Sequence, residues 1–244
     1  SLGMDDIGGL LPIEKQATVE HLITARSGVY HPASYSGDDL ARAPARGSQK
    51  PGTYMLYSNW DFNAAGYVFE LLTRRDIYDE IQAQLAIPLQ FEDWDRSVQH
   101  KEGDLSVSKY PAYPIWLSTR DMARIGHLML HEGSWNGKPV ISREWARRIV
   151  SLITPHREMN PPSARSLAFP TRWGYGVMWW VWDAPASEGP FRGAYTGMGA
   201  GGQYITVLPE YKLVIAHKTD LSTSRAVTGG EYQTILHMLV TSRK

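Results

Sequence analysis

The stretch Pro51-Gly52-Thr53-Tyr54-Met55-Leu56-Tyr57-Ser58-Asn59 is the most informative part of this chain of 244 residues. It ends in a tyrosine and an asparagine that are separated by one residue and precede a segment of helical periodicity. Asp61 is expected to cap that helix, which runs to about Arg75 with Phe62, Ala65, Val68 and Leu72 on one face. A Tyr-x-Asn sequence before a helix can present a phenol and an amide to one cleft, and a tyrosine near a lysine can act as a base once its pKa is lowered. For the tripeptide alone, a tyrosine of the core is the alternative.

Helix start signals lie on both sides of this stretch. Thr18 is expected to cap a helix that runs to Arg26, Asp76 one that ends before Pro88, and Ser142 one that runs to about Ser151. Ser118-Thr119-Arg120-Asp121 has the form of a capping box, and the helix after it is expected to end near His131, with Gly133 as the glycine at its C-terminus. Residues 29–52 predict a long surface loop, and residues 90–117 and 154–171 predict irregular structure.

The pattern changes in the last third of the chain. Strands are expected at Tyr175 to Trp182, Gln203 to Leu208 and Lys212 to Lys218, the last two forming a hairpin through Pro209, Glu210 and Tyr211. A final helix is expected at residues 231–242, with Tyr232, Ile235, Met238 and Leu239 facing the core. Helices followed by antiparallel strands, with no alternation of strand and helix, indicate an α+β fold.

Composition excludes several function classes. The formal net charge is zero, whereas nucleic-acid binders carry a basic excess. The chain has no cysteine, which excludes disulfides, thiolate metal sites and a cysteine nucleophile. No apolar run approaches the length that spans a bilayer. His127 and His131 have the i,i+4 spacing of a metal-binding pair, but no carboxylate completes a site, so neither a metal nor a cofactor is expected.

Two motifs match catalytic patterns only superficially. Gly197, Gly199 and Gly202 fit G-x-G-x-x-G, but a strand rather than a helix is expected to follow them, which argues against dinucleotide binding. A flexible bend before that strand is the simpler interpretation. Ser106-Val107-Ser108-Lys109 fits S-x-x-K, which needs a helix to bring the lysine to the hydroxyl. The glycine and prolines around it predict an irregular segment, so Ser106 and Lys109 are not expected to be catalytic. A G-x-S-x-G elbow is absent.

Five motifs, taken in order, resemble the serine β-lactamase-like superfamily, which includes class C β-lactamases, penicillin-binding DD-peptidases, esterases and 6-aminohexanoate-dimer hydrolase. They are Leu22-Ile23-Thr24-Ala25-Arg26-Ser27-Gly28, the stretch from Pro51 to Asn59, Ser118 to Arg124, Gly133-Ser134-Trp135-Asn136-Gly137-Lys138, and Gly199-Ala200-Gly201-Gly202-Gln203. The last is similar to the glycine-rich segment that replaces K-T-G or H-T-G in the esterase and amidohydrolase branches.

The resemblance implies a β-lactamase/transpeptidase-like fold and an acyl-enzyme mechanism on a small ester or amide. Tyr57 would assist proton transfer, Asn59 would orient the catalytic lysine and the substrate, and the Ala200 N–H would be an oxyanion-hole donor, worth roughly 3–4 kcal/mol in the transition state. Gly199, Gly201 and Trp179 are expected to contact substrate. Other aromatic residues of this region, Trp173, Tyr175, Trp180 and Trp182, are expected mainly in the core.

The sequence departs from the family pattern in two ways. No lysine or histidine stands at the K-T-G position, which favours an esterase or amidase over β-lactam recognition. The S-x-x-K helix of the family lies before the S-G motif, and nothing ahead of Thr18 supplies it, so the nucleophile is expected upstream of residue 1. The alternative function is a binding or structural module that has no nucleophile.

The expected organisation is a single, incomplete β-lactamase-like domain over residues 1–244. It would contain a mainly helical region at 53–151 and antiparallel strands with a C-terminal helix at 172–244. Tyr57, Asn59 and Ala200 would meet in one cleft, with Tyr57 no more than about 15 Å from Ala200, because both flank one acyl carbon. The oligomeric state is left open. The compartment is unknown, and a periplasmic or secreted bacterial location is favoured.

Overall fold

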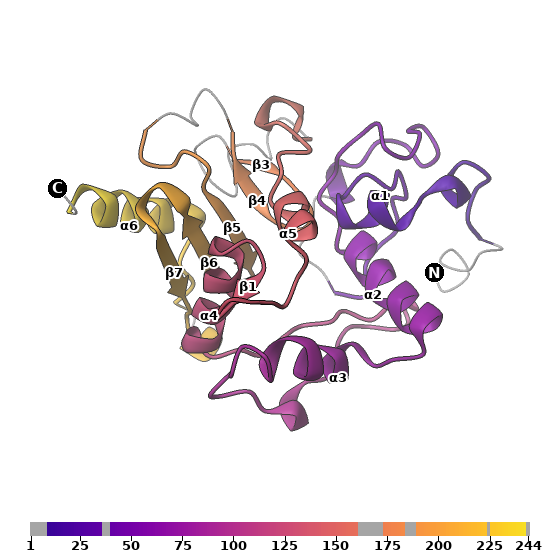
Figure 1. Cartoon of the computed structure of the whole chain (residues 1–244). Helices are drawn as coiled ribbons and strands as arrows, with labels where there is room; N and C mark the ends of the chain where they lie inside the picture. Colours follow the sequence, from indigo (N-terminus) through magenta and orange to yellow (C-terminus); the bar gives the residue numbers. More distant parts are fainter. Residues whose placement is uncertain (1–8, 36–39, 161–172, 184–188, 224, 243–244) are drawn as a thin grey trace. The chain divides into compact units, whose positions relative to one another are not determined.

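The computed structural model describes residues 9–35, 40–160, 173–183, 189–223 and 225–242 (Figure 1). The chain forms two compact units. Unit 1 comprises Ser1–Gln84 and Asp95–Trp116, and unit 2 comprises Leu85–Trp94 and Leu117–Lys244. Each unit is therefore built from two separate segments of the sequence.

Unit 1 contains the helices α1 (Val19–Ile23), α2 (Asn59–Thr73) and α3 (Ile77–Ile81). The expected N-caps of two of them are confirmed, because the Thr18 side chain accepts a hydrogen bond from the His21 N–H and that of Asp76 accepts from the N–H groups of Tyr78 and Asp79. α1 ends at Ile23, three residues before the predicted end.

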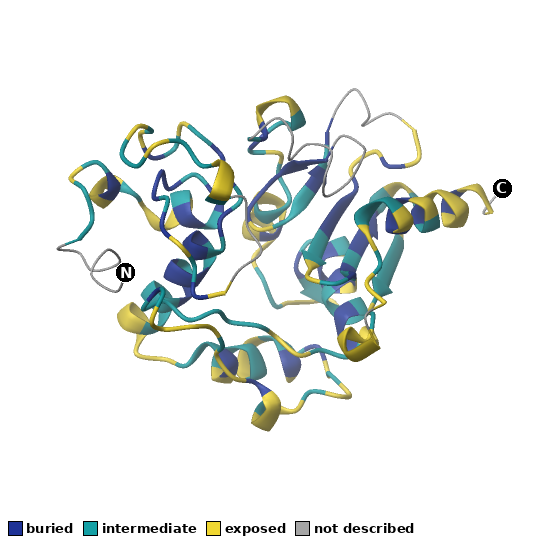
Figure 2. Ribbon diagram, turned by 180° about the vertical axis from the view of Figure 1, so that it is seen from behind, coloured by how far each residue is buried: buried dark blue, intermediate teal, exposed yellow. Residues whose placement is uncertain are grey.

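Helix α2 begins three residues earlier than predicted, so the prediction of Asp61 as its N-cap was wrong, and it buries a different face. Ser58 is its N-cap, and the buried residues are Trp60, Asp61, Asn63, Ala64 and Gly66 (Figure 2). The prediction for Leu72 was wrong, since this side chain is 73% exposed. Trp60 and Ala64 pack instead with Leu22 and Val29 in the apolar core of unit 1.

The expectation of a surface loop at residues 29–52 was partly wrong. The loop has little regular structure where it is described, but Val29, His31 and Ser34 are buried. The His31 ring lies 5.6 Å from the Trp60 ring, so the start of this loop is part of the core that supports α2.

Unit 2 is built around a five-stranded antiparallel sheet in the order β3-β4-β5-β6-β7. The strands are β3 (Trp173–Tyr175), β4 (Trp180–Trp182), β5 (Tyr195–Gly199), β6 (Gln203–Leu208) and β7 (Leu213–His217). The predicted hairpin of the last two is confirmed. The single strand predicted from Tyr175 to Trp182 was wrong: it is two paired strands around a turn in which Met178 has a φ of 57°.

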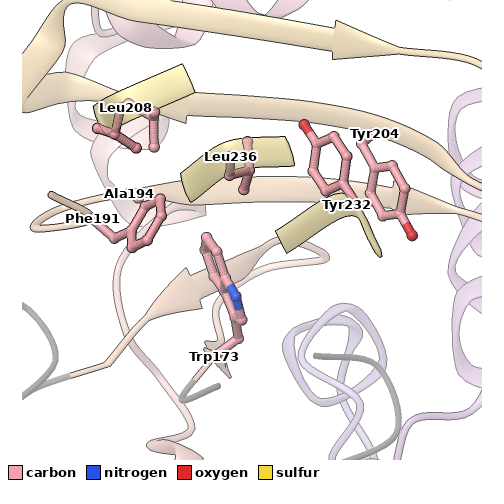
Figure 3. Packing of buried hydrophobic residues seen from close by; sticks show 8 residues of the cluster. Trp173, Phe191, Ala194, Tyr204, Leu208, Tyr232 and Leu236 are labelled. Atoms are coloured by element: carbon pink, nitrogen blue, oxygen red, sulfur yellow. The ribbon is translucent and has the colours of Figure 1, made fainter. Parts of the chain in front are cut away.

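Helices cover both faces of this sheet (Figure 1). On one face α6 (Gly229–Thr241) packs through Tyr232, Leu236 and Val240, and the Tyr232 ring stacks on that of Tyr204 at 3.9 Å (Figure 3). The prediction that Met238 faces the core was wrong, because its side chain is 65% exposed, and Leu239 is 38% exposed.

Helix α4 (Thr119–Leu130) covers the other face of the sheet. A Cβ at Gly126 would lie 2.4 Å from Val214, so the absence of a side chain permits this close packing. The α5 helix (Arg143–Ile149) and a small hairpin of β1 (Ser134–Trp135) and β2 (Lys138–Pro139) complete the unit. Asn136 and Gly137 form the hairpin turn, both with positive φ.

The predicted capping box at Ser118 is half formed. Ser118 caps α4 by accepting from the Asp121 N–H at 3.1 Å. The Asp121 carboxylate, which is fully buried, accepts instead from the backbone N–H groups of Glu92 and Asp93, at 3.0 and 3.2 Å. The acidic residue of this motif thus attaches the segment Leu85–Trp94 to α4. No helix in the described part of the chain is long and apolar enough to cross a membrane.

Candidate active site

The Tyr57-Ser58-Asn59 tripeptide lies at the N-terminus of α2 in unit 1. Tyr57 is half-buried, and its ring makes an edge contact with that of Phe62 at 5.1 Å. The Asn59 side-chain amide donates to the Tyr35 carbonyl at 3.5 Å. Ser58 is 3% exposed, its hydroxyl has no hydrogen-bond partner among the described residues, and it separates the two polar side chains.

Two of the sequence motifs pack directly against each other behind this tripeptide. The Gly52 N–H donates to the Arg26 carbonyl at 2.8 Å, and the Leu56 N–H donates to the Ala25 carbonyl at 2.9 Å. A Cβ on Gly28, whose φ is 72°, would lie 2.8 Å from the Gln49 carbonyl oxygen, so only glycine fits there. The pairing fixes the chain immediately before Tyr57.

A buried carboxylate connects the same two motifs through side chains. Asp61, 1% exposed, accepts from the Ser27 hydroxyl at 2.6 Å and from the Ser27 N–H at 3.3 Å. The Ser27 hydroxyl oxygen in turn accepts from the Val29 N–H at 3.0 Å. Asp61 is in the first turn of α2, where the helix dipole favours a negative charge. Burial, and then the charges of Tyr54 and Asp61, raises the pKa of Tyr30.

The glycine-rich segment of unit 2 is a tight turn between β5 and β6. Gly199 pairs with Gln203, so Ala200, Gly201 and Gly202 form the turn. Gly199 and Ala200 are exposed, and Gly201 is half-buried. Gly202 has a φ of 102°, and a Cβ there would lie 2.9 Å from the Val227 backbone nitrogen, so this position requires glycine.

Side chains from the end of β7 hold the carbonyl groups of this turn. The Thr219 hydroxyl donates to the Gly201 carbonyl oxygen, and Gln203 Nε2 donates to the Thr219 hydroxyl at 3.1 Å. His217 Nδ1 lies 2.8 Å from the Gly202 carbonyl oxygen. Because a carbonyl only accepts, this nitrogen carries the proton. The turn is therefore fixed despite its glycine content.

One edge of β5 extends beyond the end of its neighbour. The Trp182 N–H donates to the Ala194 carbonyl, so the Ala194 carbonyl is directed toward β4. Alternate residues of a strand face the same neighbour, so Thr196 and Met198 do likewise. The pairing with β4 ends at Thr196 opposite Trp180. Among the residues that the structure describes, the Met198 N–H thus has no strand opposite it.

The Ala200 N–H emerges on the same side. Gly199 follows the alternation toward β6, where it pairs with Gln203. In a trans peptide the C=O and the next N–H point in opposite directions, so the Ala200 N–H is directed away from β6. None of the described residues accepts a hydrogen bond from it. Met198 and Ala200 therefore offer two backbone donors along one free strand edge.

Trp179 flanks this edge. Trp179 directly precedes β4, and a Cβ on Gly197 would lie 3.8 Å from the Trp179 ring, an ordinary van der Waals contact. The ring makes an edge contact with that of Tyr195 at 5.7 Å. The expectation for the other aromatic residues is confirmed for Trp173 and Tyr175, which are buried and 2% exposed.

Thr196 and Gly197 lie on a strand at this edge, which the sequence pattern did not predict. These residues have the T-G of the K-T-G pattern, and Tyr195 stands where that pattern has its lysine. Burial, and then the charge of Glu132, raises the pKa of Tyr195. The Thr-Gly pair could have been recognised in the sequence, but the five glycines from Gly193 to Gly202 argued against a strand there.

Two other pairs of residues matched catalytic or metal-binding patterns in the sequence. The segment of Ser106 and Lys109 is not helical, as predicted: Ser106 donates to Asp104 at 2.6 Å, and the Lys109 ammonium lies over the Tyr110 ring at 5.1 Å. His127 and His131 have ring centroids 4.2 Å apart. Among the described residues there is no group of three or more His, Cys, Asp or Glu side chains that could hold a metal ion.

Tyr57 and Asn59 belong to unit 1, and Gly199, Ala200, Gly201 and Trp179 belong to unit 2. Each set is assembled within its own unit, around α2 in the first and around β5 in the second. Their convergence on one acyl carbon stays a prediction.

Comparisons with known proteins place these motifs in a family. The Beta-lactamase family model matches residues 9–227. A curated, uncharacterized protein of Alkalihalophilus pseudofirmus is 22% identical over 224 residues, which cover 83% of this chain and 60% of that protein. The chain thus spans about 60% of the length of this curated relative.

Solved structures share the fold. A Bacillus anthracis protein named as a candidate 6-aminohexanoate-dimer hydrolase superimposes with a TM-score of 0.57 at 17% identity, covering 93% of this chain and 60% of that one. A family VIII carboxylesterase gives a TM-score of 0.60 at 14% identity, covering 94% and 71%. The helices and antiparallel sheet described above are those of a β-lactamase/transpeptidase-like fold, and the chain belongs to the Beta-lactamase family.

Proposed function

We propose that this chain is part of a serine hydrolase that cleaves an ester or amide through an acyl-enzyme. The observation that carries the proposal is the Tyr57-Ser58-Asn59 tripeptide at the N-terminus of α2 in a chain of the Beta-lactamase family. The pairing of residues 25–28 with 51–56 supports it, because that pairing orders the backbone ahead of Tyr57.

In this proposal Tyr57 transfers a proton to and from the nucleophile and the leaving group, and Asn59 orients the catalytic lysine. The serine and lysine of the S-x-x-K motif come from a segment of the longer protein that precedes Ser1. The chain spans about 60% of the length of these two relatives, which is compatible with this assignment. The irregular structure around Ser106 and Lys109 argues against a nucleophile there.

The free edge of β5 supplies the oxyanion donor. Ala200 is the donor that the resemblance implies, and the strand register adds Met198 as a second, directed to the same side. Gly199 and Gly201 allow an acyl group to approach the backbone, and Trp179 contacts it. A donor of this kind contributes roughly 3–4 kcal/mol to transition-state stabilisation.

The test uses the full-length protein encoded by the gene. It is incubated with p-nitrophenyl esters, small amides and nitrocefin, and the adduct of a fluorophosphonate probe is mapped by mass spectrometry. We expect ester or amide hydrolysis, a probe adduct on the serine of an upstream S-x-x-K, and a loss of about 10²–10⁴ in kcat for Tyr57→Phe. Tyr67→Phe, a half-buried tyrosine further along α2, is the matched control.

The same experiment distinguishes the hydrolase from the alternative, a binding or structural module that has no nucleophile. A full-length protein without S-x-x-K, probe labelling or turnover would be a binding or structural module, and the hydrolase proposal would be wrong. Equal activity of the Tyr57→Phe and Tyr67→Phe variants would contradict the role given to Tyr57.

A further inference from the structure

The free edge of β5 lies between two segments of uncharged side chains. Residues 176–182 form the turn before β4 and β4 itself, and residues 195–202 form β5 and the glycine turn. Neither segment contains Asp, Glu, Lys, Arg or His. A group that lies along this edge therefore meets the Trp179 indole and glycine backbone, with the N–H groups of Met198 and Ala200 as its polar contacts on these two segments, while the Met198 side chain packs against the cluster under α6.

At the position where the K-T-G pattern has a lysine, β5 has Tyr195, whose side chain is a phenol. Tyr195 is 6% exposed, and the rings of Trp179 and Tyr195 pack edge to face. Burial raises its pKa, so the phenol stays neutral near pH 7. The acidic residue whose charge raises the Tyr195 pKa is Glu132, and Glu132 forms ion pairs with Arg143 and Arg147. The strand itself thus provides no cation to a carboxylate.

Trp179 provides a wall of definite shape. Its ring is half-buried and lies over the Cα of Gly197, at ordinary van der Waals distance from where a Cβ would be. Gly197 precedes Met198, whose N–H points to the free edge. A flat, apolar group bound to that N–H through its carbonyl would have the indole ring as its neighbour, and stacking on such a ring is favourable for aromatic groups.

We propose that the acyl group held at this edge is uncharged and apolar, with an aromatic acyl group preferred, and that Trp179 determines this specificity. The inference rests on the proposed function and narrows its substrate class. A carboxylate on the acyl chain would lose its hydration shell against Trp179 without gaining a partner on the strand.

A matched pair of substrates tests the charge preference in the full-length protein. p-Nitrophenyl pentanoate and mono-p-nitrophenyl glutarate have the same chain, with a terminal methyl group in the first and a carboxylate in the second. We expect kcat/KM to be at least about tenfold higher for the pentanoate, because the pocket wall offers the carboxylate no compensating contact. A glutarate ester that is hydrolysed as well as or better than the pentanoate would overturn the inference and leave the proposed function standing.

Variants test the role of Trp179. With p-nitrophenyl phenylacetate, Trp179→Ala is expected to lower kcat/KM about tenfold, mainly through KM, and Trp179→Phe to retain most of the activity. Trp145→Ala, which removes a tryptophan that is 47% exposed on α5, is the control. Unchanged kinetics in a folded Trp179→Ala protein would contradict the assignment. Hydrolysis of neither ester in the pair would overturn the acyl assignment, and the amide panel and the fluorophosphonate probe would then decide the proposed function separately.

Discussion

The substitution Ser27→Ala removes the side-chain connection between the two motifs of unit 1. The Ser27 hydroxyl donates to the buried Asp61 carboxylate at 2.6 Å, and a hydrogen bond to a charged group contributes about 1.5–3 kcal/mol to stability. Its oxygen also accepts from the N–H of Val29, a residue that is 2% exposed, and an orphaned buried donor costs about 1–3 kcal/mol. The sum predicts a loss of about 2.5–6 kcal/mol.

This loss is measured by urea unfolding of the chain, followed by circular dichroism and tryptophan fluorescence. For a protein of this size it corresponds to a fall in Tm of roughly 10 °C. Ser48→Ala, which removes an exposed hydroxyl in the same unit, is the control and should change stability by no more than about 0.5 kcal/mol.

A double-mutant cycle refines the result. Ser27→Ala combined with Asp61→Ala removes both partners, and the double variant is expected to lose less than the sum of the single variants. Additive losses would mean that the two side chains act independently. A Ser27→Ala loss below about 1 kcal/mol would refute the reasoning, since it would show that water replaces both contacts.

Three further outcomes are expected. Thr219→Val removes the hydroxyl that donates to the Gly201 carbonyl; in the full-length protein it should lower kcat about tenfold at unchanged KM, and hydrogen exchange in the turn should become faster, with Thr219→Ser restoring both. Asp121→Ala leaves the backbone N–H groups of Glu92 and Asp93 without their acceptor, so it should destabilise unit 2 by about 1–3 kcal/mol in urea unfolding and expose residues 85–94 to proteolysis, whereas unchanged proteolysis would contradict its anchoring role. Burial opposes ionisation of Glu14, but the hydrogen bonds from Arg46 and the Leu11 N–H outweigh it and lower the Glu14 pKa below 4.5. The stability from Glu14 should therefore be complete above that value and be lost as pH falls through the folded-state pKa, and Glu14→Gln should flatten the acid limb of a plot of Tm against pH.

Local signals in the sequence predicted the starts of four helices, but not that of α2, where Ser58 and not the predicted Asp61 is the N-cap. Thr18, Asp76, Ser118 and Ser142 each accept the backbone hydrogen bonds that their spacing predicts, because capping depends on three or four neighbouring residues. The Asp121 carboxylate shows the limit of such reasoning. The two N–H groups that donate to it belong to residues 29 and 28 positions away, and a contact over that separation leaves no mark in a local pattern.

The sheet was predicted less well, for a related reason. β5 contains two glycines and has low intrinsic strand propensity, yet it pairs with β6 at five positions. Tertiary pairing therefore creates this strand. The turn at Met178 is also hidden, because a non-glycine residue with positive φ is uncommon and the run from Tyr175 to Trp182 is rich in strand-forming residues.

The candidate site divides along the same line. Tyr57 and Asn59 were found from the sequence because they are adjacent to a helix start. The free N–H of Met198 was not, since it follows from where the β4 pairing stops. A strand register is a property of two segments together, and the sequence of either segment alone does not specify it.

The segment Leu85–Trp94 interrupts unit 1 in the sequence but belongs to unit 2. A ribosome that synthesises this chain therefore delivers the first part of unit 1, then a short piece of unit 2, then the rest of unit 1. Neither unit is complete when its first segment emerges. The ten residues of Leu85–Trp94 cannot be anchored until α4 has been synthesised, because Asp121 of α4 accepts their backbone hydrogen bonds. Unit 1 is complete once Trp116 has emerged, whereas unit 2 still needs the residues from Leu117 onward, so we expect residues 85–94 to become ordered after the rest of their surroundings, and no single cut in the gene would separate the two units.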